Sequence, residues 1–180
     1  MKPNSLEELY VEQLKDLYDA EQQIMEALPE MIDAATSNDL KNALTEHLEV
    51  TKTQATRLDQ IFNALGEKAK GEKCKGMEGV IEEGSDLIED IEDTDVRDAA
   101  IIAAAQRVEH YEMAGYGTAR TYATLLGEDE ATQLLQQTLD EEKEADQTLT
   151  ALASEINVSA GGKTIESEIR EVPKKGKRIA

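Results

Sequence analysis

Acidic residues stand at positions where the apolar pattern of this sequence predicts leucine or alanine. In three segments, apolar residues recur every three or four positions, as on the buried face of a helix, and carboxylates fall on that face. The carboxylates are Glu21, Glu109, Glu112, Glu142 and Asp146. A buried carboxylate costs several kcal/mol unless it is paired, protonated or bound to a metal. Several of them from different helices therefore predict a carboxylate-bridged metal site inside a four-helix bundle.

The residue types in this set indicate which metal it would take. Glu109-x-x-Glu112 and Glu142-x-x-x-Asp146 have spacings that place both carboxylates on one side of a helix. The sequence contains no Glu-x-x-His, the pattern that supplies imidazole in many dimetal bundles. Oxygen ligands favour manganese or ferric iron over zinc and copper. We therefore expect one or two ions of iron or manganese.

His47 is the histidine that shares a face with apolar neighbours, Leu40, Leu44 and Leu58. It is either a hydrogen-bonded core residue or a metal ligand, and we include it among the candidate ligands. His110 lies off the Glu109 face and is not expected to be a direct ligand.

Two of the acidic positions have simpler structural interpretations. Glu21 could form an internal ion pair with Arg107 or Lys52. The run of residues 140–146, DEEKEAD, would ordinarily be a solvated surface, and within it Glu141 falls off the apolar stripe and is expected to be exposed.

Five helical segments must position these residues. The chain shows no alternation typical of strands, and we predict an all-α fold with four long helices and one short helix between the two helical pairs. Ser5 should begin the first helix and Pro29 should kink or break it, whereas Thr94 should cap the third long helix. Gly161 and Gly162 should end the fold. The expected helices span 5–35, 39–65, 77–92, 94–127 and 129–158.

The two halves of the chain resemble each other weakly, and the similarity aligns the residues that interrupt the apolar stripes. Glu21 matches Glu112, Glu49 matches Glu141, and Gln54 matches Asp146. The remaining match sets Val50 against Glu142. Each half should thus supply a carboxylate from its first helix and a cluster of carboxylates from its second, with Val50 standing where the other half has Glu142.

Composition and charge restrict the partners. The chain of 180 residues has a net charge of −20, so its body should repel nucleic acid and anionic membranes. The basic C-terminal end is the one feature that could attract nucleic acid, and we do not expect nucleic acid to be a partner.

The single cysteine, Cys74, excludes an internal disulfide and is expected to be a free thiol in the link between helices. With no apolar run long enough for a bilayer and no signal peptide, we expect a cytoplasmic protein.

Four stretches carry a family resemblance that covers roughly residues 4–158. They are LYDAEQQIMEALPEM, CKGMEGVIEEGSDLIED, VRDAAIIAAAQRVEHYEMAGYGTA and QTLDEEKEADQTLT. Together they resemble the YciF/YciE family of bacterial ferritin-like proteins. The resemblance implies a ferritin-like bundle over residues 1–160, a homodimer, a dimetal site and a link to stress responses. Residues 161–180 would form a polar, flexible, basic-ended tail.

By position, the resemblance makes Glu21, Glu112 and Glu142 the inward carboxylates, with Glu109 and Asp146 as neighbours. Relatives commonly read His-Leu-Glu-Glu-Thr on the second helix, whereas residues 47–51 of this chain read His-Leu-Glu-Val-Thr. One expected ligand is therefore missing, and a site for a single metal ion is one outcome.

Two functions remain open from the sequence. The first is a metal-binding ferritin-like protein that carries out metal-centred oxidation or peroxide handling. The second is a non-catalytic stress or interaction protein without metal. In that protein, Arg107, His47, tyrosines and water would satisfy the inward carboxylates.

Overall fold

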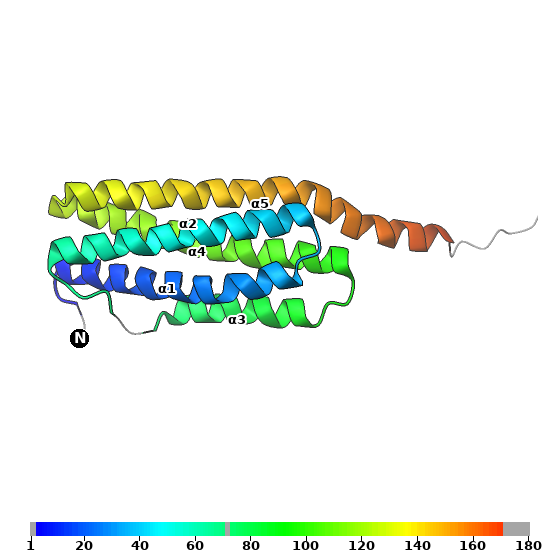
Figure 1. Ribbon diagram of the computed structural model, residues 1–180, viewed down its shortest axis with the longest axis horizontal. Coiled ribbons are helices and arrows are strands. Elements are labelled where there is room, and N and C mark those ends of the chain that lie inside the picture. Colours follow the sequence, from blue (N-terminus) through cyan, green and yellow to red (C-terminus); the bar gives the residue numbers. More distant parts are fainter. Residues whose placement is uncertain (1–2, 71–72, 171–180) are drawn as a thin grey trace, which may run out of the picture.

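Five α-helices make up the part of the chain that the computed structural model describes, which is residues 3–70 and 73–170, with side chains up to Gly162. No strand occurs within those ranges, in agreement with the predicted all-α fold. The helices follow one another along an elongated bundle (Figure 1). They are α1 (Leu6–Ala34), α2 (Asn38–Leu65), α3 (Lys75–Glu89), α4 (Thr94–Leu126) and α5 (Asp129–Arg170).

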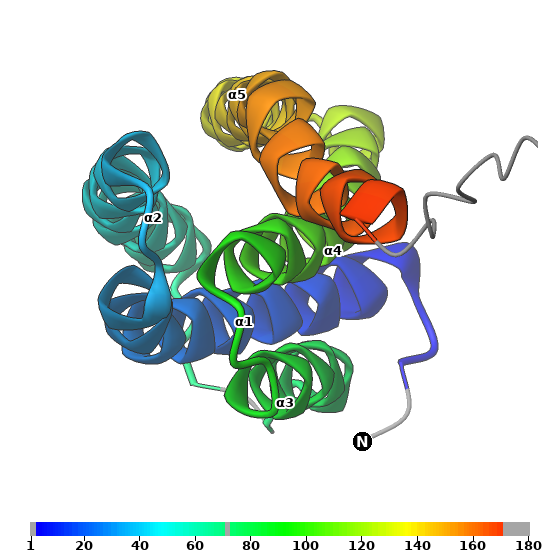
Figure 2. The same cartoon turned by 90° about the vertical axis from the view of Figure 1, so that its right-hand side faces the viewer.

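The four long helices form two antiparallel pairs. α1 packs on α2 and α4 packs on α5, and the pairs join through contacts between α1 and α4 and between α2 and α5. The short helix α3 lies outside this square and packs against α4 and α1, as the end-on view shows (Figure 2). The predicted four-helix bundle with one extra short helix is therefore confirmed.

Side-chain caps fix where the helices begin. The hydroxyl of Ser5 accepts a hydrogen bond from the N–H of Glu8, as the sequence predicts for the start of α1. The cap of α4 is Asp93, not the predicted Thr94, because its carboxylate accepts from two N–H groups of the first turn. Cys74 is a free, buried thiol and is itself the N-cap of α3. These caps set the register in which each helix presents its polar residues inward.

Two helices continue through residues that the sequence analysis expected to interrupt or end them. α1 continues through Pro29 without a break, because Pro29 is exposed and the residues around it bury an apolar face that outweighs one lost hydrogen bond. α5 passes Gly161 and Gly162 and continues to Arg170 instead of ending near Val158, and it projects beyond the bundle (Figure 1). Glycine only weakens a helix, so two glycines do not have to end one. The domain boundary at residue 160 stays a prediction.

Two apolar clusters fill the bundle, one on each side of a polar layer. The first cluster contains Ile24, Leu44 and Leu149, and α3 covers part of it. The second contains Leu14, Leu58 and other residues toward the opposite end of the bundle. On every long helix, the inward residues between the two clusters are polar. The fold thus brings the acidic interruptions of the apolar stripes into one layer.

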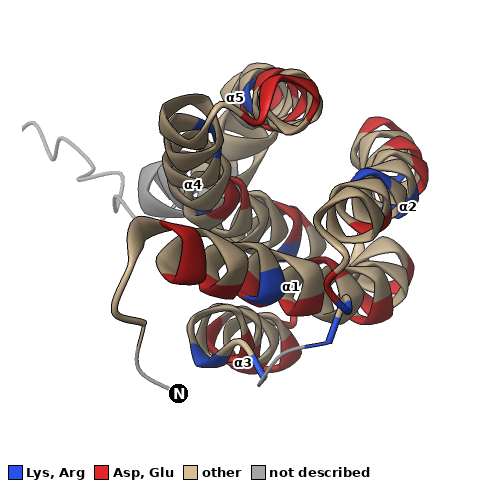
Figure 3. Cartoon of the chain, turned by 90° about the vertical axis from the view of Figure 1, so that its left-hand side faces the viewer, with Lys and Arg blue, Asp and Glu red and all other residues tan. Residues whose placement is uncertain are grey.

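Acidic side chains are spread over all five helices and outnumber basic ones (Figure 3). Among the described helices, none combines the length and the apolar character that crossing a bilayer requires.

Candidate metal centre

Five of the six predicted ligands meet in the polar layer, and they come from all four long helices. α1 supplies Glu21, α2 supplies His47, α4 supplies Glu109 and Glu112, and α5 supplies Glu142. All four glutamates are at most 2% exposed, which is exceptional for carboxylates. The three-residue step between Glu109 and Glu112 turns both toward the interior, as the sequence spacing predicts.

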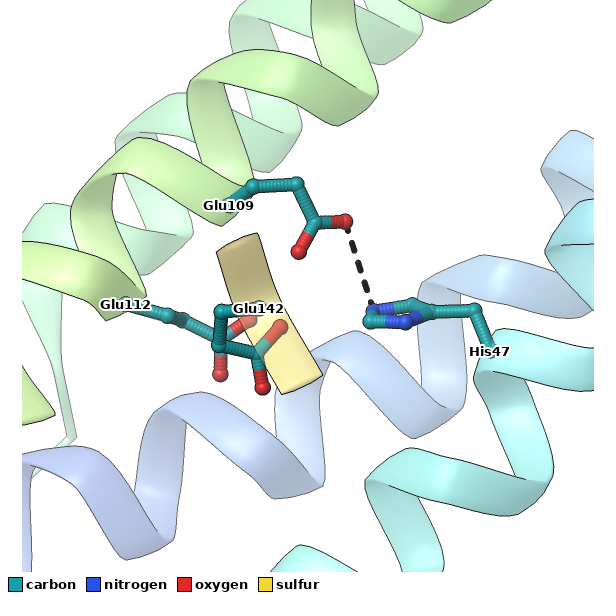
Figure 4. A group of neighbouring side chains, drawn as sticks. All are labelled: His47, Glu109, Glu112 and Glu142. Carbon is teal, nitrogen blue, oxygen red and sulfur yellow. Dashed lines mark ion pairs between the residues drawn. The ribbon is translucent and has the colours of Figure 1, made fainter. Parts of the chain in front are cut away.

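Four of these side chains form a compact group. One ligand atom from each of His47, Glu109, Glu112 and Glu142 lies within 4.8 Å of the corresponding atoms of the others. Glu109 reaches toward the imidazole, with 3.4 Å between its Oε1 and Nε2 of His47, and the carboxyl groups of Glu112 and Glu142 lie together beside them (Figure 4). Ligands of a divalent ion lie roughly 2 Å from it, so four atoms this close can share one ion after small side-chain adjustments.

The group also leaves buried atoms without partners. Within the described part of the chain, one oxygen of each of the four glutamates and Nε2 of His47 make no hydrogen bond. Buried polar groups are normally satisfied, and each exception needs a reason. A cation among these atoms would satisfy the cluster, so the residues fit a metal ion.

Burial and mutual repulsion control the protonation of the cluster. Loss of solvation raises the pKa of Glu21, Glu109 and Glu112 well above the usual value, and neighbouring carboxylates raise it further. The pKa of Glu142 rises to about 7, mainly through burial. Burial lowers the pKa of His47 to about 4. The imidazole is therefore neutral at physiological pH, which is the form that binds metals.

Neutral donors support two of the carboxylates. The hydroxyl of Tyr116 donates a hydrogen bond to Oε1 of Glu21, and the amide of Gln54 donates to Oε1 of Glu142. Each bond orients its carboxylate and leaves the second oxygen free. Such partners fix the geometry of ligands in metal sites.

An ion pair that the sequence did not reveal lies next to this layer. Arg57 is 8% exposed and binds Glu141 through both terminal nitrogens, at 2.5 and 2.7 Å. Glu141 was expected to be exposed, but it is partly buried because Arg57 and Gln54 draw its side chain toward the bundle; Nε2 of Gln54 lies 3.3 Å from Oε2 of Glu141. The charge of Arg57 also lowers the pKa of Glu142 and Glu21, which partly offsets burial. The sequence signal that could have indicated this ion pair is the presence of Arg57 on a mostly apolar face of α2.

Asp146 is the predicted ligand that the structure leaves outside the group. Its Oδ1 accepts a hydrogen bond from Gln106 at 3.0 Å and lies 3.4 Å from Nε2 of His110. Four residues after Glu142, position 146 is turned about 40° around the helix axis, toward the surface of α4. Asp146 therefore lies at the edge of the layer.

The alternative interpretation of Glu21, an internal ion pair with Arg107 or Lys52, is not seen among the described residues. Arg107 lies 4.0 Å from Glu83 near the surface, and Lys52 pairs with Glu49 on its own helix. Arg107 is thus not a partner of the inward carboxylates.

Known proteins resemble the chain over most of its length. Residues 5–160 match the family model described as a domain of unknown function, DUF892. Protein YciF of Escherichia coli K12 is 44% identical over 165 residues, which cover 91% of this chain and 99% of that protein.

Solved structures share the fold. The crystal structure of the E. coli stress protein YciF has a TM-score of 0.83 at 44% identity and covers 86% of this chain and 98% of its own. YcfI from Rhodopseudomonas palustris has a TM-score of 0.80 at 47% identity, with 82% and 94% covered. A protein from Xanthomonas campestris, 20% identical with a TM-score of 0.74, shares the fold alone. With the family model matching most of its length, the chain belongs to the DUF892 family, together with YciF.

Proposed function

We propose that the protein binds one ion of iron or manganese through His47, Glu109, Glu112 and Glu142, with Glu21 beside them. The observation that carries this proposal is the set of buried, unpartnered ligand atoms that converge from α2, α4 and α5. Three carboxylates and one imidazole suit iron and manganese, whereas zinc and copper prefer more nitrogen or sulfur. Asp146 is proposed to remain outside the ligand set.

One ion rather than two is proposed because α2 contributes no inward carboxylate. Gln54 faces Glu142 with an N–H donor, which cannot bind a metal ion. Val50 replaces the carboxylate that the internal repeat and the family pattern predict. Arg57 supplies a fixed positive charge near the same layer. These residues reduce the need for a second cation.

A bound redox-active ion would supply electrons for the reduction of dioxygen or peroxide, so metal-centred oxidation or peroxide handling is the proposed chemistry. The protein would hold His47 neutral and orient Glu21 and Glu142 through their hydrogen-bonded partners. The description of YciF as a stress protein supports a stress-related role. We further propose a cytoplasmic homodimer, on the family resemblance alone.

Metal content tests the proposal. Protein purified without chelator should contain about one iron or manganese per chain by elemental analysis, and chelator-treated protein should bind Mn²⁺ with the same stoichiometry by calorimetry. The double variant Glu109→Gln/Glu142→Gln should bind none, because it loses two charged ligands. Glu144→Gln on the exposed face of α5 is the matched control. Absence of metal from the wild type, or equal binding by the double variant, contradicts the proposal.

A metal-free structural role is the second candidate, and a specific observation favours it. The raised pKa values allow the carboxyls to be neutral near pH 7 and to donate hydrogen bonds to one another. In that case the melting temperature of the chelator-treated protein would not change with added Mn²⁺ or Fe²⁺, and the first proposal would fail.

A further inference from the structure

A cavity of about 310 Å³ adjoins the candidate metal centre on the side of the first apolar cluster. All five helices contribute to its walls, which are mainly apolar. Figure 2 shows this end of the bundle, with α3 below α1 and α4. Each helix contributes apolar residues to the wall; examples, in the order α1 to α5, are Ile24, Leu44, Ile81, Ala105 and Leu149.

The inner end of the cavity is polar. His47 and Glu109 belong both to its wall and to the candidate ligand group. Glu109 is 2% exposed, and its Oε2 has no hydrogen-bond partner; Nε2 of His47 has none either. An occupant of the cavity would therefore meet two unsatisfied polar atoms, and both accept hydrogen bonds when Glu109 is ionised and Nδ1 of the neutral His47 carries the proton.

Val50 makes this end more apolar than the sequence pattern predicts. It stands at the position where a carboxylate was expected, and it lines the cavity. A glutamate there would add a charge to the wall. The valine therefore removes a charge and extends the apolar surface toward His47.

The size and charge of the cavity define the class of occupant. Its volume is about twice the roughly 150 Å³ of an engineered cavity that binds benzene, so it fits a molecule of about ten to twelve non-hydrogen atoms. The exposed acidic residues Glu30, Glu46 and Glu144 also belong to its lining and would repel anions. Apolar walls with a few convergent polar groups are typical of sites for small molecules.

We propose that this cavity binds a small, apolar, uncharged molecule with a hydrogen-bond-donating head group, of which an alkylphenol is the simplest representative. The head group meets His47 and Glu109, and the hydrocarbon part packs among the apolar side chains. This inference goes beyond the proposed function: the head group and an ion would use the same atoms of His47 and Glu109, so the molecule binds the metal-free protein and competes with the ion. Binding itself needs no metal.

Methyl NMR of the full-length, chelator-treated protein tests the inference. Met31 lines the cavity, whereas Met113 packs in the second apolar cluster and serves as an internal reference. Titration with 4-propylphenol should shift the methyl signal of Met31 saturably and leave that of Met113 in place. The anion 4-propylbenzoate, of similar shape, should bind at least about tenfold more weakly. Equal binding of both compounds overturns the assigned head group.

Two variants locate the binding. Ala145→Phe fills the cavity from α5 without altering a ligand and should abolish the Met31 shift, whereas Ala114→Phe on the exposed face of α4 should keep it. A saturable shift that survives Ala145→Phe in a folded protein, or no shift in the wild type, overturns the inference.

Mn²⁺ titration of the same chelator-treated protein, before the phenol is added, separates the two proposals. Metal binding without the Met31 shift refutes the occupant alone. A Met31 shift without metal binding refutes the metal centre and leaves the binding site supported.

Discussion

Replacing Glu142 by glutamine should stabilise the metal-free protein at alkaline pH. The side chain is fully buried, and its pKa rises from 4.5 to about 7 on folding. A raised carboxyl pKa contributes stability that is complete below about pH 4.5 and is lost as the pH rises through about 7. At 1.36 kcal/mol per pKa unit, the ionised carboxylate costs about 3 kcal/mol at pH 8. Glutamine removes this cost and can still accept the hydrogen bond from Gln54.

The effect should be visible in thermal unfolding followed by circular dichroism in the presence of chelator. For a chain of this size, about 3 kcal/mol corresponds to a rise in melting temperature of roughly 6 to 12 °C at pH 8. At pH 5 the variant and the wild type should differ little. The lowered pKa of His47 reduces stability as the pH falls below about 6.5, but it acts on both proteins equally. Glu144→Gln, on the exposed surface, is the control.

Two results would contradict the assigned role of Glu142. Glu142→Gln could destabilise the metal-free protein equally at pH 8 and pH 5, which would show that the carboxylate is neutral or well compensated in the folded state. Alternatively, Mn²⁺ could raise the melting temperature of the variant as much as that of the wild type, which would show that Glu142 is not a ligand. We expect instead that the variant is more stable than the wild type without metal and gains less stability from added Mn²⁺.

Three further predictions test the packing and the metal stoichiometry. A Cβ added at Gly115 would lie 2.7 Å from Cδ2 of buried Leu17, whereas one at Gly117 meets its nearest atom at 4.0 Å. Urea unfolding should therefore find Gly115→Ala at least about 1 kcal/mol less stable than Gly117→Ala; equal stability would contradict the close approach of α1 and α4. Val50→Glu should raise Mn²⁺ binding from one ion to two per chain in calorimetry, and an unchanged stoichiometry would refute the missing-ligand explanation. Asp98 accepts hydrogen bonds of 2.7 Å from the N–H groups of Thr36 and Ser37, in the turn between α1 and α2. Asp98→Ala should cost about 2 to 3 kcal/mol in urea unfolding, and a loss below about 0.5 kcal/mol would contradict that role.

The positions of the inward carboxylates were predictable from the sequence. Helical periodicity is a local property, so Glu21, Glu109 and Glu112 could be assigned to buried faces without knowledge of the fold. His47 could be placed in the same way. The helical segments and the extra short helix follow from the same periodicity and from capping residues.

The partners of these residues were not predictable, because they depend on how helices pack. Arg57 and Glu141 are 84 positions apart, and their ion pair turns a predicted surface residue into a partly buried one. Asp146 shares a stripe with Glu142, but a rotation of about 40° is enough to direct it toward Gln106. The continuation of α1 through Pro29 likewise depends on tertiary burial that propensity does not include.

The cavity illustrates the same limit. Val50 was recognisable as a departure from the internal repeat, yet nothing in the sequence indicated that it lines an open space beside His47. Cavities arise where neighbouring helices diverge, and divergence depends on the side chains of both.

Anomalous diffraction would locate a metal ion inside the bundle and identify its ligands. A crystal of the protein grown with Mn²⁺, measured at the manganese absorption edge, should show one strong peak at the centre of the bundle. The peak should lie roughly 2 to 2.5 Å from His47, Glu109, Glu112 and Glu142. No peak inside the bundle, although the crystal was grown in saturating Mn²⁺, would contradict the proposed metal centre. A peak contacted only by surface carboxylates such as Glu144 would contradict it too.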